Sequence, residues 1–234
     1  MSSPCLLALD TATETCSVAL LRDGAVWLRS ESVGQRHSER ALPMVDELLR
    51  TAGLALHEVD VIAFGAGPGS FTGLRIACGL AQGLAWGAGK KVIAVGNLMA
   101  LAARVFEREP GCGRVLCAID ARMHESYCAV YRRGDVPLEE RAPQLARPEE
   151  LAILAHGVDA VAGDALTVFD SALAGFEGLR SPQLRADAGD IARLAATPPM
   201  LARAVSPHEA APVYVRDRVA LTIAERQLRA ATAG

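Results

Sequence analysis

The stretch from residue 59 to residue 87 limits the possible folds of this chain more than any other part of it. An apolar run at 59–64 is typical of a buried strand. The glycine-rich string Gly65-Ala-Gly-Pro-Gly-Ser-Phe-Thr-Gly73 follows it, and residues 72–86 are then apolar nearly all round. A helix of that kind is buried on most of its sides. The sequence therefore predicts a strand, a tight turn and a largely buried helix.

The turn between this strand and this helix suits an anion. N–H groups at a helix N-terminus are unpaired and carry the positive end of the helix dipole. A second polar loop, 10–13, directly follows the first apolar run and could flank a phosphate or its metal ion. Two ordinary turns remain an equal alternative, because neither the Walker spacing nor the dinucleotide spacing fits. The candidate phosphate-loop residues are Asp10, Thr11, Thr13, Gly67, Pro68, Gly69, Ser70, Thr72 and Gly73.

Both halves of the chain open with adjacent strands and then become helical, which is the plan of a duplicated α/β fold. Apolar runs at 5–9, 17–21 and 25–33 predict three strands, and Asp23-Gly24 predicts a tight hairpin between the last two. The chain of 234 residues can hold two small domains. We expect an N-terminal subdomain at 1–107, with a helix at 216–231 packing back on it, and a smaller subdomain at 108–215.

Metal-dependent and Ser-dependent hydrolysis both lack their sequence motifs. The five histidines are never closer than about 20 positions, so no H-x-x-x-H pair can place two imidazoles on one ion. Ser70 has Pro68 and Thr72 where a nucleophile elbow needs glycines, so we expect Ser70 to be the N-cap of the following helix. The six cysteines contain no C-x-x-C. We therefore predict no metal ligands and no catalytic residues.

The net charge and the first residues of the chain bear on its expected partners and compartment. The formal net charge is −3, which argues against an independent duplex-binding surface, since such surfaces need clustered Lys and Arg. No basic region precedes the first apolar run, so we expect a cytoplasmic protein. Arg75 and four glycines interrupt the apolar helix, which argues against a membrane span.

Four strings, in order along almost the whole chain, resemble the TsaB (YeaZ) family. Residues 66–76, Ala-Gly-Pro-Gly-Ser-Phe-Thr-Gly-Leu-Arg-Ile, are close to the most characteristic string of that family. Leu9-Asp-Thr-Ala-Thr13 with 16–20 resembles its first strand-turn-strand, and Ile119-Asp-Ala-Arg-Met123 its second hairpin. Pro212-Val-Tyr-Val-Arg-Asp217 is similar to its C-terminal signature.

The resemblance implies an α/β fold of the ASKHA class (actin, sugar kinase and Hsp70), with two related subdomains. It also implies a non-catalytic role in making N6-threonylcarbamoyladenosine at position 37 of tRNA. The partners that it implies are TsaD, the catalytic paralogue with an H-x-x-x-H motif, and TsaE, with a homodimer when the chain is alone. Contact with tRNA would come only through the complex. ATP or ADP with Mg²⁺ could bind at or near the TsaD interface, with no tightly bound cofactor.

In this family the first two helices form the partner surface. Apolar residues at 41–52 fill an arc of roughly 160°, wider than the stripe of about 100° that a surface helix needs. The surplus could also be extra burial inside the domain. An independent ATPase or kinase of the ASKHA class is the alternative function. The predicted interface residues are Leu42, Met44, Val45, Leu48, Leu49, Arg75, Ile76, Gly79, Leu80 and Gly83.

Overall fold

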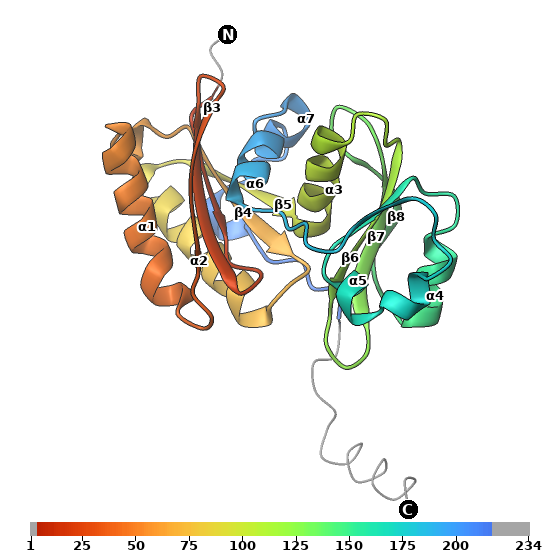
Figure 1. Ribbon diagram of the computed structural model, residues 1–234. Coiled ribbons are helices and arrows are strands. Elements are labelled where there is room, and N and C mark those ends of the chain that lie inside the picture. The colour runs from red at the N-terminus through yellow and green to blue at the C-terminus, as the bar shows by residue number, and fades with distance from the viewer. Residues whose placement is uncertain (1–3, 217–234) are drawn as a thin grey trace, which may run out of the picture.

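A computed structural model describes residues 4–216 and contains two five-stranded mixed sheets (Figure 1). Alternate residues along each strand point to opposite faces of the sheet. A strand that is apolar on both faces therefore contributes to a hydrophobic core on each side. The strands of the first sheet are β1 (Leu6–Asp10), β2 (Thr15–Arg22), β3 (Ala25–Ser32), β4 (Val61–Gly67) and β5 (Lys91–Gly96). Those of the second are β6 (Arg114–Asp120), β7 (Ser126–Arg132), β8 (Leu138–Ala146), β9 (Ala160–Ala162) and β10 (Leu179–Ser181).

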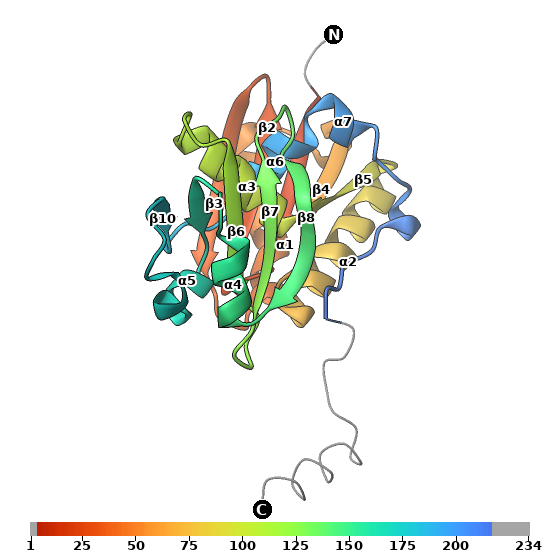
Figure 2. The same ribbon diagram turned by 90° about the vertical axis from the view of Figure 1, so that its right-hand side faces the viewer.

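The two sheets repeat one topology. The first has the order β3-β2-β1-β4-β5, and the second, written from its other edge, has β8-β7-β6-β9-β10 (Figure 2). In each, the first strand is antiparallel to the second and parallel to the fourth. The predicted duplicated α/β fold of the ASKHA class is confirmed. The predicted hairpin is confirmed as well, with positive φ at Asp23 and Gly24.

Helices and sheets alternate in layers, with α3 and α6 between the two sheets (Figure 1). Helices α1 and α2 share a core with one face of the first sheet, and α6 packs on its other face. Helix α3 covers the second sheet, whose far face holds α4 and α5. The helices are α1 (His37–Ala52), α2 (Phe71–Ala88), α3 (Asn97–Arg108), α4 (Pro148–Leu154), α5 (Ala165–Val168), α6 (Ala188–Ala195) and α7 (Pro198–Leu201).

Helix α6 lies on the first sheet, although the sequence placed it within 108–215. Its apolar face meets β1 and β2, and Arg104 of α3 donates to Asp187 at 2.6 Å and to Asp190 at 2.8 Å. This ion pair fixes the start of α6 beside α3. The division of the chain at residue 107 stays a prediction. The helix predicted at 216–231 lies outside the described residues, apart from Arg216.

Between residues 4 and 216, every helix is too short or too polar to cross a lipid bilayer.

Candidate functional site

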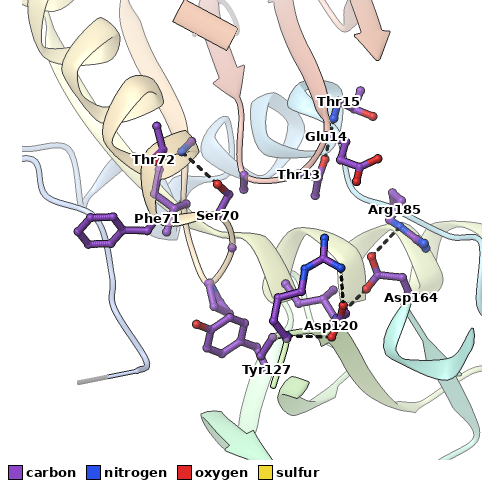
Figure 3. Close-up of a pocket in the computed structure, with 18 of the residues that line it drawn as sticks. Thr13, Glu14, Thr15, Ser70, Phe71, Thr72, Asp120, Tyr127, Asp164 and Arg185 are labelled. Atoms are coloured by element: carbon purple, nitrogen blue, oxygen red, sulfur yellow. Dashed lines mark hydrogen bonds and ion pairs between the residues drawn. The ribbon is translucent and has the colours of Figure 1, made fainter. Parts of the chain in front are cut away.

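A cleft of about 1290 Å³ opens between the two halves at the carboxyl ends of β1, β4 and β6. One wall comes from the first half, with residues 12–15 after β1 and 68–74 at the start of α2. The other comes from the second half and includes 119–123 and Asp164 (Figure 3). Loops at the carboxyl edge of parallel strands are where ligands bind in open α/β folds. The cleft is therefore the candidate site.

Glycines let the loop before α2 pass close to the loop after β1. A Cβ at Gly73 would stand 1.8 Å from the carbonyl oxygen of Thr11, and one at Gly69 would stand 2.7 Å from the Cβ of Ala12. Gly67 has φ +123° and precedes a cis bond to Pro68, a conformation that favours glycine. Ser70 caps α2, as expected, by accepting from the Gly73 N–H at 3.4 Å.

Six of the predicted phosphate-loop residues line this part of the cleft. Ser70, Thr72 and Gly73 line the cleft with Pro68 and Gly69, and Thr13 lies opposite them on the neighbouring loop. Among residues 4–216, the backbone N–H groups of Phe71 and Thr72 find no acceptor. Unpaired N–H groups at the start of a long helix favour a negatively charged ligand.

Asp10 and Thr11 are buried behind this wall and do not line the cleft. Asp10 accepts from the Ala12 N–H at 3.1 Å and from the Asn97 side chain at 3.0 Å. Thr11 donates to the Gly73 carbonyl at 2.6 Å. Both side chains thus have hydrogen-bond partners inside the fold and hold the loops in place. The sequence had predicted them beside a phosphate.

Asn97 ties this region together and was missed by the sequence reasoning. Its amide oxygen accepts from the Gly67 N–H at 2.7 Å while its amide nitrogen donates to Asp10. Burial raises the pKa of Asp10 to about 6, against the lowering effect of the bonds from Ala12 and Asn97. The only available signal was a polar residue at the start of an apolar helix, which does not reveal its partners.

The second wall carries charged side chains that sequence reasoning had not selected as site residues. Asp164 accepts from the Asp120 N–H at 2.8 Å and pairs with Arg185 at 3.5 Å, and Arg122 pairs with Asp120 at 3.2 Å (Figure 3). Tyr127 lies beside them on the same wall. The strings 119–123 and 126–131 signalled a hairpin here, but Asp164 and Arg185 come from distant loops.

Within residues 4–216, no group of three or more His, Cys, Asp or Glu side chains gathers to hold a metal ion. Asp120 and Asp164 at the cleft each pair with an arginine, and Asp164 also accepts from a backbone N–H. The six cysteines are buried as free thiols, and burial raises the pKa of Cys16 to about 11.

Helix α1 turns most of its predicted interface residues inward. Met44, Val45, Leu48 and Leu49 are buried in the core that α1 shares with the first sheet. They do not form a free surface of the chain, which corrects the predicted contact role of these four residues. The wide apolar arc is explained by burial inside the subdomain. Leu42, 48% exposed, is the one predicted interface residue of α1 that reaches the surface.

Helix α2 does present an exposed strip along its predicted face. Arg75, Gly79 and Gly83 are exposed, and Ile76 and Leu80 are half-buried beside them. A Cβ at Gly79 or Gly83 would meet no atom within 4 Å. Trp86, which the sequence reasoning did not select, is 74% exposed further along the same helix. We call Arg75, Gly79, Gly83 and Trp86 the α2 strip.

Comparison with known proteins relates this chain to tRNA modification. The family model described as "TsaD: tRNA N6-adenosine threonylcarbamoyltransferase" matches residues 30–166. The tRNA threonylcarbamoyladenosine biosynthesis protein TsaB of Escherichia coli is 39% identical over 92% of this chain and 96% of its own length. TsaB of Haemophilus influenzae is 52% identical over 54% of this chain and 53% of its own length.

A solved structure extends the likeness to the whole fold. YeaZ from Pseudomonas aeruginosa superimposes with a TM-score of 0.83 at 40% identity, covering 90% of this chain and 99% of that one. The sequence match to the Escherichia coli relative and this superposition both run through the two sheets and the cleft loops. The chain belongs to the TsaB (YeaZ) family of tRNA threonylcarbamoyladenosine biosynthesis proteins.

Proposed function

We propose that this chain is a non-catalytic subunit in the synthesis of threonylcarbamoyladenosine at position 37 of tRNA. It would bind TsaD, enable that enzyme to transfer the threonylcarbamoyl group, and meet TsaE and tRNA only within the complex. The proposal rests on the family membership and on the exposed α2 strip. In the absence of TsaD, the chain would form a homodimer through the surface that binds TsaD. It would do so in the cytoplasm.

The exposed α2 strip is the observation that carries the docking proposal. Trp86 stands 74% exposed, more than any other large apolar residue of α2, and tryptophan is among the residues that contribute most to protein interfaces. The open space at Gly79 and Gly83 lets another helix approach closely. Apart from Leu42, the α1 residues support the strip from behind instead of contacting the partner.

Gly79→Glu tests the docking surface without threatening the fold. Glutamate is a better helix former than glycine, and its side chain enters open space, so the isolated variant should stay folded. It should lose co-purification with TsaD by tenfold or more, because a charge buried at a contact is costly. Gly111→Glu, at another exposed glycine with open space around it, is the matched control. Unchanged binding by both Gly79→Glu and Gly83→Glu would contradict the proposal.

The cleft supports a second candidate, an independent ATPase or kinase that binds ATP or ADP with Mg²⁺. Its support is the anion-compatible start of α2, with unpaired N–H groups at Phe71 and Thr72 within the described part of the chain. In the leading proposal the same nucleotide would bind at or near the TsaD interface. Purified chain with ATP and Mg²⁺ separates the two. Turnover of about 1–1000 per second would favour the kinase, and the absence of turnover would favour the subunit.

A further inference from the structure

The segment 210–216, here called the strap, crosses from the first half of the molecule to the second along the cleft. Its beginning is fixed to the first half. The carbonyl oxygen of Ala210 accepts from the Gln82 side chain at 2.9 Å. The Val213 N–H donates to the carbonyl oxygen of Ala66, in β4, at 2.7 Å. Val213 and the three residues after it line the cleft.

The middle of the strap is clamped to the start of α2. The Tyr214 ring lies 5.4 Å from the Phe71 ring, centroid to centroid. The Arg75 guanidinium stacks 3.9 Å above the Phe71 ring, and its Nε donates to the Tyr214 hydroxyl at 3.1 Å. A cation stacked on an aromatic face adds electrostatic attraction to the apolar contact. The strap therefore rests on α2 by both apolar and polar contacts.

The end of the strap is bound to the second half of the molecule. Arg216 pairs with the Glu125 carboxylate at 2.7 Å and donates to the carbonyl oxygen of Ala121 at 3.2 Å. The two side chains of the ion pair are only 14% and 26% exposed. An ion pair with hydrogen bonds in such partly buried surroundings is screened less by solvent than one on the open surface. Arg216 thus makes a specific contact across the cleft.

The turn that Arg216 holds has an unusual backbone. Arg122, Met123 and His124 have φ values of +63°, +56° and +60°, a region that L-residues other than Asn and Asp seldom adopt. Ala121 and Glu125 flank this turn and bond to each other through the Ala121 N–H. Arg216 contacts these same two flanking residues. A strained turn persists only where its surroundings over-determine it, and the strap supplies that restraint.

We propose that the strap is a conformational tie between the two halves, with the Arg216–Glu125 ion pair as its latch. While the latch is closed, the hairpin between β6 and β7 is held against the first half and the strap forms part of the cleft wall. When the latch opens, the strap loses its hold on the second half, its bonds to the first half open more often, and the cleft can widen. Partner docking is not required for this tie.

Hydrogen exchange of the Val213 amide, followed by NMR on the full chain, tests the tie. This amide bonds to Ala66 in the first half, whereas Glu125 lies in the second half. Glu125→Gln should speed Val213 exchange about tenfold, because the Arg216 contact loses its carboxylate charge and is weakened. Arg216→Gln should have the same effect. Arg180→Gln, which breaks an ion pair with Asp170 inside the second half, is the control and should leave Val213 exchange unchanged.

The exchange rate at Val213 decides the proposal in either direction. Faster exchange in both latch variants, together with the control at the wild-type rate, supports a tie that crosses the cleft. If Val213 in Glu125→Gln exchanges at the wild-type rate, the proposal is overturned, even if amides of residues 121–125 exchange faster. The ion pair would then stabilise only the hairpin and would not restrain the strap. If Arg216→Gln fails to fold, the Val213 rate in Glu125→Gln is sufficient to support or overturn the tie.

Discussion

Replacing Asp10 by asparagine should change how the stability of this protein depends on pH. Asp10 is only 2% exposed at the end of β1, and burial raises its pKa to about 6, well above the ordinary range of an aspartate. An acid whose pKa is higher in the folded state binds its proton more tightly there. The folded state is therefore favoured at low pH, and this contribution is lost as the pH rises through about 6. Asparagine keeps an oxygen that can accept from Ala12 and Asn97 but has no proton to lose.

The size of the effect follows from the pKa of Asp10 in the folded and unfolded states. An unperturbed aspartate has a pKa of about 3.9, and a difference of about two in pKa corresponds to about 3 kcal/mol over the full titration. Between about pH 5 and pH 7 the folded state loses most of its Asp10 proton, while the unfolded state has already lost its own. The wild type should therefore lose about 1 kcal/mol of unfolding free energy in this interval from Asp10 alone. Asp10→Asn removes that loss, whatever constant cost the new amide adds at both pH values.

Urea unfolding of both proteins at about pH 5 and pH 7, followed by circular dichroism, measures the difference. The free energy of unfolding of Asp10→Asn minus that of the wild type should rise by about 1 kcal/mol from the lower to the higher pH. Asp46→Asn, at an exposed carboxylate paired with Arg50, reports the effect of losing one surface charge. A difference that is equal at the two pH values, or that falls with pH, would refute the reasoning about burial.

Three further outcomes test the packing. Gly73→Ala should unfold the protein or lower its thermal midpoint sharply, since the new Cβ would overlap the carbonyl of Thr11 at 1.8 Å; a wild-type midpoint would contradict the close approach. Met44→Ala should cost about 2–5 kcal/mol of unfolding free energy, whereas Leu42→Ala should cost much less, and equal costs would refute the assignment of Met44 to the core. The six buried thiols should react with a thiol reagent only as the protein unfolds, and rapid labelling of Cys16 in the folded protein would contradict its burial.

Local patterns were enough to predict most of the fold. Apolar runs of strand length and the Asp23-Gly24 turn predicted the meander of the first sheet, because hairpin register depends on neighbouring residues. Helix α2 was predicted from its apolar length and its Ser70 cap. The position of α6 was not predictable in this way. An amphipathic helix shows that one face is buried, but its sequence does not say which of two sheets it covers.

The candidate site was less predictable, since its important contacts join residues far apart in the chain. The phosphate-loop string was found, and most of its residues do line the cleft. Asp10 and Thr11 were misplaced because a polar residue after a strand can face either the ligand or the fold. Only the buried Asn97 and its two hydrogen bonds show that Asp10 faces the interior of the fold. Likewise, an apolar arc on α1 cannot distinguish a wide core from a partner surface.

The duplicated topology explains why both halves of the chain contribute turns to one cleft. The carboxyl ends of β1 and β6 occupy equivalent positions in the two sheets, so the turns after them both contribute to the cleft. In the first turn, the carboxylate and hydroxyl of Asp10 and Thr11 hold the loops of α2 in place. In the second, Arg216 holds the flanking residues from outside. Side chains used in this way fix the first half, and with it the α2 strip, in one shape. Such rigidity would favour the docking that we propose, since less conformational freedom is then lost on binding.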